Sequence, residues 1–115
     1  MATLAFEKSL GKWMEAEKEL FNECMAYIKS QLGLMPNNEI YIDYGNISST
    51  PSVICRNDDG YMASDVEMVY LYNGHIYIDT EDFYQYPISC LTAKELSIIA
   101  IAVKETIEAN FDVEE

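Results

Sequence analysis

The sequence predicts an α+β domain: a long N-terminal helix, a four-stranded antiparallel meander and a C-terminal helix, with both helices packed on one face of the sheet. Two observations lead to this class. Apolar residues recur at spacings of three and four near both ends of the 115-residue chain, which indicates amphipathic helices. Between them, short segments alternate apolar and polar residues and are joined by short connections, which favours antiparallel strands. We therefore expect a single domain over residues 1–115.

The first helix is predicted over residues 3–32. Thr3 is a suitable N-cap, and Gly33 suits the position after the last helical residue. An apolar stripe runs along this segment: Leu10, Trp13, Met14, Leu20, Phe21, Cys24, Ile28 and Leu32. We expect this stripe to pack on the sheet. Gly11 costs about 1 kcal/mol relative to alanine in a helix interior, so the first turns are expected to be the weakest part.

The sheet is predicted over residues 39–81. Segment 39–44 alternates, with Ile40 and Ile42 on one face and Tyr41 and Asp43 on the other, and a second strand spans residues 52–56. Asn73-Gly74 then joins two longer strand segments, because both residues tolerate the positive φ of a two-residue type I′ turn. This turn sets four cross-strand pairs: Tyr72–His75, Leu71–Ile76, Tyr70–Tyr77 and Val69–Ile78. One face of the hairpin is therefore predicted to be aliphatic and the other phenolic.

The last part of the chain is predicted to be an irregular segment followed by a helix. Residues 82–90 are rich in aromatic side chains, and Pro87 disfavours a regular element there. Thr92 and Glu95 make a capping box at the start of a helix over residues 92–110. Apolar side chains cover more of this helix than one sheet contact requires. We expect it to lie between the sheet and the first helix; the alternative is half of a homodimer contact.

Charge is the strongest compositional signal. The chain carries 20 acidic and 7 basic residues, a net charge of −13, and residues 36–91 contain nine acids and one base, Arg56. The electrostatic field of so many negative charges repels nucleic-acid backbones and anionic membranes and attracts basic proteins. The alternative is that the charge serves only to keep the protein soluble. No signal peptide or membrane-spanning segment is expected. We expect a soluble, cytoplasmic protein that binds neither nucleic acid nor membrane directly.

Residues for catalysis or metal binding are scarce. The three cysteines, Cys24, Cys55 and Cys90, are widely spaced, and the single histidine, His75, flanks the hairpin turn. This arrangement predicts reduced thiols and no metal site, and it lacks the nucleophile–base pairing of a catalytic triad. No glycine-rich phosphate loop is present. We expect no cofactor and assign no catalytic residue.

One group of residues favours a role in protein binding. Tyrosines and carboxylates are predicted to share the phenolic face of the sheet, and tyrosine is enriched at protein interfaces. The predicted interaction residues are Tyr41, Asp43, Tyr70, Tyr72, His75, Tyr77 and Asp79. We interpret the chain as a small acidic interaction module that docks a basic partner, in its sharpest form an inhibitor that mimics nucleic acid and occupies a nucleic-acid-binding protein. The alternatives are a small-ligand-binding domain or enzyme with a pocket near Asp82–Cys90, and a structural homodimer through the 92–110 helix.

Overall fold

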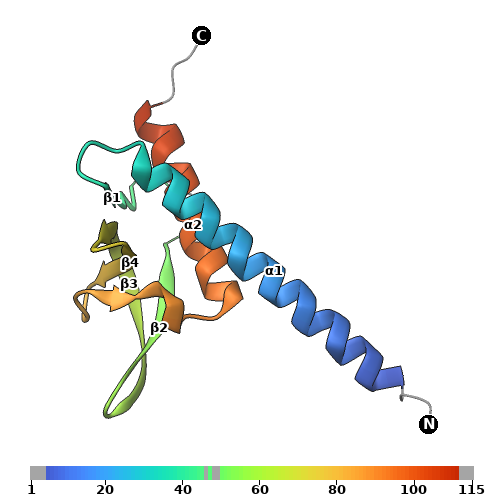
Figure 1. Ribbon diagram of the computed structural model, residues 1–115. Coiled ribbons are helices and arrows are strands. Elements are labelled where there is room, and N and C mark those ends of the chain that lie inside the picture. The colour runs from blue at the N-terminus through green and yellow to red at the C-terminus, as the bar shows by residue number, and fades with distance from the viewer. Residues whose placement is uncertain (1–4, 46, 48–49, 112–115) are drawn as a thin grey trace.

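The computed structural model confirms an α+β domain with two helices packed against an antiparallel sheet. It describes residues 5–45, 47 and 50–111, apart from the side chain of Phe111; the predicted cap Thr3 lies outside these residues. The elements are α1 (Ala5–Gly33), β1 (Glu39–Tyr41), β2 (Ser52–Asn57), β3 (Gly60–Tyr72), β4 (His75–Thr80), β5 (Tyr86–Pro87), the 3-10 helix η1 (Ile88–Cys90) and α2 (Ala93–Phe111). Figure 1 shows both helices on the same side of the sheet.

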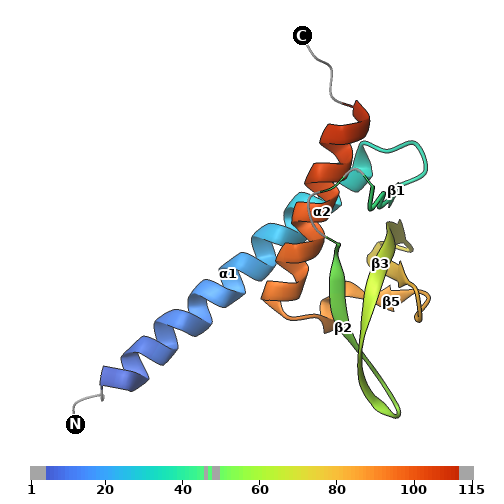
Figure 2. The ribbon, with the colours of Figure 1, turned by 180° about the vertical axis from the view of Figure 1, so that it is seen from behind.

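Strand β3 is the longest strand, and it pairs with β1, β2 and β4. The strand order is β1-β3-β4-β5, and β2 also pairs with β3. The 13 residues of β3 leave room for two partners in succession: β2 pairs with residues 60–65, and β1 pairs with residues 68–70. The strands before the hairpin therefore pair with β3 and not with each other, which is a difference from a simple meander. Figure 2 shows the β2–β3 hairpin extending beyond the rest of the sheet.

The β3–β4 hairpin has the predicted turn and register. Asn73 and Gly74 have φ angles of 52° and 82°, as a type I′ turn requires. All four predicted pairs are present, and the pairing continues through Met68 and Asp79 to an irregularity between Val66 and Met68. The aliphatic face is the covered one, with its residues buried or half-buried: Val69, Leu71, Ile76 and Ile78.

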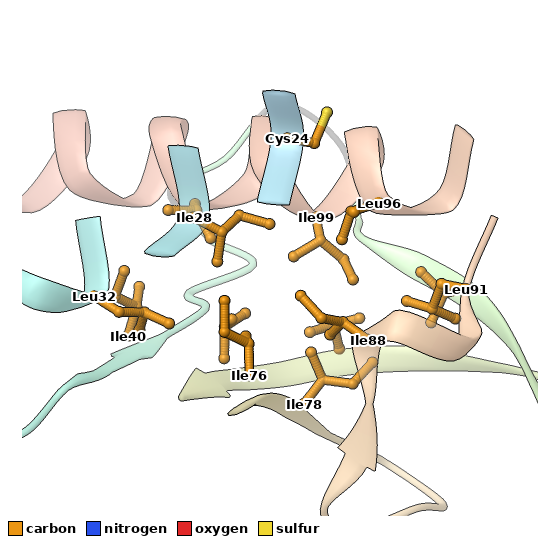
Figure 3. Packing of buried hydrophobic residues seen from close by; sticks show 14 of the residues in the cluster. Cys24, Ile28, Leu32, Ile40, Ile76, Ile78, Ile88, Leu91, Leu96 and Ile99 are labelled. Atoms are coloured by element: carbon orange, nitrogen blue, oxygen red, sulfur yellow. The ribbon is translucent and has the colours of Figure 1, made fainter. Parts of the chain in front are cut away.

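Helix α2 packs against both α1 and the sheet, but it does not separate them as predicted, because α1 also contacts β3 directly. Its capping box is formed: the Glu95 amide donates to Thr92 Oγ1 (3.2 Å), and the Thr92 amide donates to Glu95 Oε1 (3.0 Å). Leu96 and Ile99 reach the core beside residues from α1, the sheet and η1 (Figure 3). Among the described residues of α2, Ile101 is the one large apolar side chain that is exposed (52%).

Only the C-terminal half of α1 is covered. Cys24, Ile28 and Leu32 are buried against α2 and the sheet, whereas the N-terminal half extends past the body of the molecule (Figure 1). The expectation that the whole stripe packs on the sheet is therefore wrong for Leu10, Trp13, Met14 and Leu20, which are 41–60% exposed. A helix of 29 residues is about 44 Å long, and the 19-residue α2 spans only about 29 Å. The helix runs without interruption through Gly11.

The segment after β4 is more regular than predicted. Pro87 belongs to β5, where an edge strand tolerates the missing amide donor. A buried polar network fixes the start of the segment: Thr80 Oγ1 accepts hydrogen bonds from Ser64 Oγ (2.9 Å) and from the amide of Phe83 (2.9 Å). This network holds the turn after β4 against β3.

Candidate interaction face

The uncovered side of the sheet carries one group of side chains, which we call the outer face. Direct cross-strand partners share a face, so the pairs Tyr41–Met68, Met68–Asp79 and Tyr70–Tyr77 assign β1, β3 and β4 to one surface. The outer face consists of Glu39, Tyr41, Met68, Tyr70, Tyr72, His75, Tyr77 and Asp79. It contains two acidic residues and no lysine or arginine.

The aromatic rings of the outer face form a continuous cluster around Tyr77. Its ring centroid lies 5.9 Å from that of Tyr70, 6.4 Å from Tyr72 and 6.5 Å from His75. These separations lie in the range of favourable aromatic contacts. Tyr41 and Tyr72 remain 64% and 53% exposed. The cluster is therefore held in place by its own contacts while its rim stays accessible.

Carboxylates lie between the rings. Asp79 Oδ1 accepts hydrogen bonds from the Tyr70 hydroxyl (3.0 Å) and from the Gln85 amide (2.9 Å). Burial, together with this bond to Asp79, raises the pKa of Tyr70 to about 12. A hydrogen bond with Glu39 raises the pKa of Tyr41, and the charge of Asp79 adds to the shift. Both phenols therefore keep their protons to a higher pH than an unperturbed tyrosine does.

The structure brings together six of the seven predicted residues. The exception is Asp43, which lies beyond the end of β1, where its Oδ1 accepts a hydrogen bond from the Gly45 amide (3.0 Å). Glu39 and Met68 belong to the outer face but are missing from the predicted set. Glu39 is two residues before Tyr41 in an alternating segment, so its position could have been predicted from that alternation.

Within the described residues, no hydrogen bond joins His75 to a carboxylate or hydroxyl group that would complete a nucleophilic triad. His75 is exposed and lines a hollow of about 330 Å³ with Lys29, Tyr77 and Ser89. Two of the three thiols, Cys24 and Cys55, are buried, and Cys90 is exposed. Burial raises the pKa of Cys55 to about 11, with help from Glu95, so this thiol is protonated and unreactive at neutral pH.

A second hollow, of about 660 Å³, lies beside the Asp82–Cys90 segment between β2, β5 and the start of α2. Its lining includes Arg56, Tyr86, Cys90 and Glu95. The polar groups here already hold the fold together: the Tyr86 hydroxyl accepts the Arg56 amide (3.0 Å), and Glu95 Oε2 accepts the Ile54 amide (2.8 Å). The Arg56 guanidinium stacks over Tyr61 at 5.6 Å. These contacts serve structure, and nothing in this hollow singles out a ligand.

The fold and the outer face define a small α+β domain with an open aromatic sheet surface. No protein-family model, curated protein or solved structure matches this chain. No helix in the described part of the chain has a stretch long and apolar enough to cross a bilayer. The described residues also contain no group of three or more histidine, cysteine or acidic side chains arranged to hold a metal ion.

Proposed function

We propose that this protein is a small acidic interaction module whose outer face docks a basic protein. One observation carries the proposal: the aliphatic face of the β3–β4 hairpin is sealed by helices, while the opposite face presents a continuous tyrosine cluster to solvent. A surface that is both aromatic and accessible, at the centre of a rigid sheet, has the composition of an interface core. Tyrosine also gives large contact area at low entropy cost.

The chemistry of the face favours a cationic partner. Arginine stacks over tyrosine rings and pairs with carboxylates, and the outer face offers rings flanked by Asp79 and Glu39. Both hydrogen bonds to Asp79 fall on Oδ1, so Oδ2 accepts neither of them. The surrounding sheet region adds its excess of eight negative charges over residues 36–91, which would steer a basic surface toward the face. The most specific version of this proposal is that the partner is a nucleic-acid-binding protein. The module would then act as its inhibitor.

A capture experiment with matched variants tests this function. The protein is immobilised and exposed to a cell lysate, and retained proteins are ranked by isoelectric point. We expect basic proteins to be retained, to elute as salt rises from roughly 50 to 300 mM, and to be lost by the double variant Tyr41→Ala/Tyr72→Ala. The control is Tyr61→Ala/Tyr84→Ala, which removes two tyrosines that are 74% and 79% exposed but lie outside the outer face.

Two results would contradict the proposal. One is a retained set without a bias toward basic proteins; the other is equal loss of retention in both double variants. Competition by duplex DNA for the retained protein separates the two forms of the proposal: displacement supports nucleic-acid mimicry, and its absence leaves only the general basic partner.

A further inference from the structure

The N-terminal half of α1, residues 5–20, forms an exposed helical arm. Figures 1 and 2 show it extending away from the sheet, and its C-terminal part, at Trp13, Met14 and Glu17, lines a hollow of about 570 Å³ with Thr92 and Ala93 at the start of α2. Its large apolar side chains are Phe6 (66% exposed), Leu10 (51%), Trp13 (60%), Met14 (55%) and Leu20 (41%). Scattered single apolar residues on a surface are ordinary, but these side chains lie on one continuous stripe. The stripe continues directly into the buried residue Cys24.

The spacing of this stripe is that of a coiled-coil seam. Residues 6, 10, 13, 17, 20 and 24 follow one another at alternating steps of four and three, which are the a and d positions of a heptad repeat. Five of these six positions are apolar, and Glu17 is the exception. The charged residues Lys8, Lys12, Glu15, Lys18 and Glu19 fall outside the seam. Such a seam is typical of a helix that pairs with another helix.

We propose that the arm pairs antiparallel with the arm of a second copy of this chain. In antiparallel coiled coils an a position faces a d position, and one register aligns all six seam positions; Cys24, the last of them, is already buried against α2 of its own copy. In that register Leu10 faces Leu20 of the second copy and Trp13 faces its Glu17. A parallel pair would instead place the two Glu17 carboxylates against each other. The antiparallel pair gives each carboxylate an indole N–H donor.

The same register places Phe6 opposite Cys24 of the second copy, where the body of that copy begins. A shallow apolar hollow of about 220 Å³ is present there, lined in part by Leu20, Cys24, Ala100 and Ile101. Leu20 and Ile101 are 41% and 52% exposed, so Phe6 would cover both. Each end of the paired arms therefore meets an apolar surface that the second copy supplies.

The flanking positions are compatible with this pairing. Beside the seam, Met14 faces Met14 of the second copy on one flank, and Ala16 faces Ala16 on the other, so no like charges meet there. Large side chains bury on the order of 100–200 Å² each, so five partly exposed ones from each copy supply about 1,000 Å². That is the lower limit of a specific interface, and a two-fold axis uses the same patch twice.

The pairing is independent of the outer face, and its test is separate. Sedimentation and light scattering at micromolar concentration should show a dimer of the full chain. Trp13→Glu is expected to raise the dimer dissociation constant at least about a hundredfold, because the residue is central and occurs twice. Its matched control is Lys12→Glu, one residue away but outside the seam, which should leave the dimer intact. At a protein concentration low enough for the wild type to be monomeric, both variants should unfold at the same denaturant concentration as the wild type, since neither residue belongs to the buried core cluster.

Cysteine cross-linking tests the orientation. Leu10→Cys and Leu20→Cys are made in a Cys90→Ser background, because Cys90 is the exposed native thiol. The antiparallel register predicts a disulfide-linked dimer from the mixture of the two variants and little from either variant alone. Cross-linking of each variant with itself would show a parallel pair and overturn the proposal. A wild-type monomer, or a dimer unaffected by Trp13→Glu, would overturn it as well.

Discussion

The two faces of the β3–β4 hairpin share one backbone and one register but meet different surroundings. On the inner face, Val69 and Ile78 are fully buried beneath the helices. On the outer face, Tyr70 and Tyr77 are half-buried by each other and by their neighbours, on the side of the sheet opposite the core. The inner face therefore contributes to folding through burial of apolar surface, whereas the outer face holds its side chains in position without sealing them. The side chains of the outer face are therefore available to contact a partner protein.

The largest expected effect is on the inner face. Ile78→Ala should lower the free energy of unfolding by about 2–5 kcal/mol, because it opens a cavity at a fully buried position. Tyr72→Ala, six residues away on the outer face, should cost less than about 1 kcal/mol, since it loses mainly a cross-strand ring contact. Urea unfolding of both variants measures the contrast. Equal losses would mean that the two faces do not differ in the way described.

Two buried threonines, one at the end of β4 and one in α2, give a sharper test with the same substitution. Thr80 and Thr106 are both buried, but Thr80 Oγ1 accepts several hydrogen bonds whereas Thr106 Oγ1 has no partner among the described residues. Thr80→Val should cost about 1–3 kcal/mol, because it leaves the Phe83 amide without its acceptor, while the Ser64 hydroxyl keeps Asp82 Oδ2 at 2.8 Å. Thr106→Val should leave stability unchanged or raise it by up to about 1 kcal/mol. Thermal unfolding distinguishes the two, and a loss at Thr106 as large as that at Thr80 would show that the buried network contributes nothing specific.

The turn that separates the faces should have an intermediate effect. Gly74→Ala places a Cβ on a residue with φ of 82°, which costs roughly 1–2 kcal/mol even though no atom lies within 4 Å of that Cβ. Gly33→Ala is the control: its added Cβ also meets nothing, and its φ is not positive. Guanidinium unfolding should show a loss for Gly74→Ala and no loss for Gly33→Ala. A tolerated alanine at residue 74 would contradict the proposed role of the turn in fixing the register.

The smallest effect concerns the pH dependence of stability. Burial and Asp79 raise the pKa of Tyr70 to about 12, above the value of about 10 for an unfolded tyrosine. The unfolded chain then releases this proton first, so the stabilisation is complete below about pH 10 and is lost as pH rises toward 12. Tyr70→Phe should make the loss of stability between these pH values less steep. Part of the pH dependence should remain in this variant, because the pKa of Tyr44 is also raised to about 12. An unchanged slope in Tyr70→Phe would show that the phenol does not titrate as described.

Local patterns in the sequence predicted the hairpin well because Asn73-Gly74 sets both the turn and the register within a few residues. The capping box of Thr92 and Glu95 was predictable for the same reason. The pairing of β1 with β3 joins residues such as Tyr41 and Met68, which are far apart in the chain, and period-two alternation carries no information about such partners. Periodicity also shows which side of α1 is apolar but not how much of it another element covers. The outer face was therefore predictable nearly in full, and the exposed arm was not.

Tyrosine modification in the presence of a captured basic partner tests the central claim most directly. The free protein should be nitrated at Tyr41, Tyr72, Tyr61 and Tyr84, because all four are more than half exposed. When the partner is bound, Tyr41 and Tyr72 should be protected while Tyr61 and Tyr84 remain reactive. Protection of Tyr61 and Tyr84 with continued modification of Tyr41 and Tyr72 would place recognition elsewhere on the molecule and contradict the assignment of the outer face.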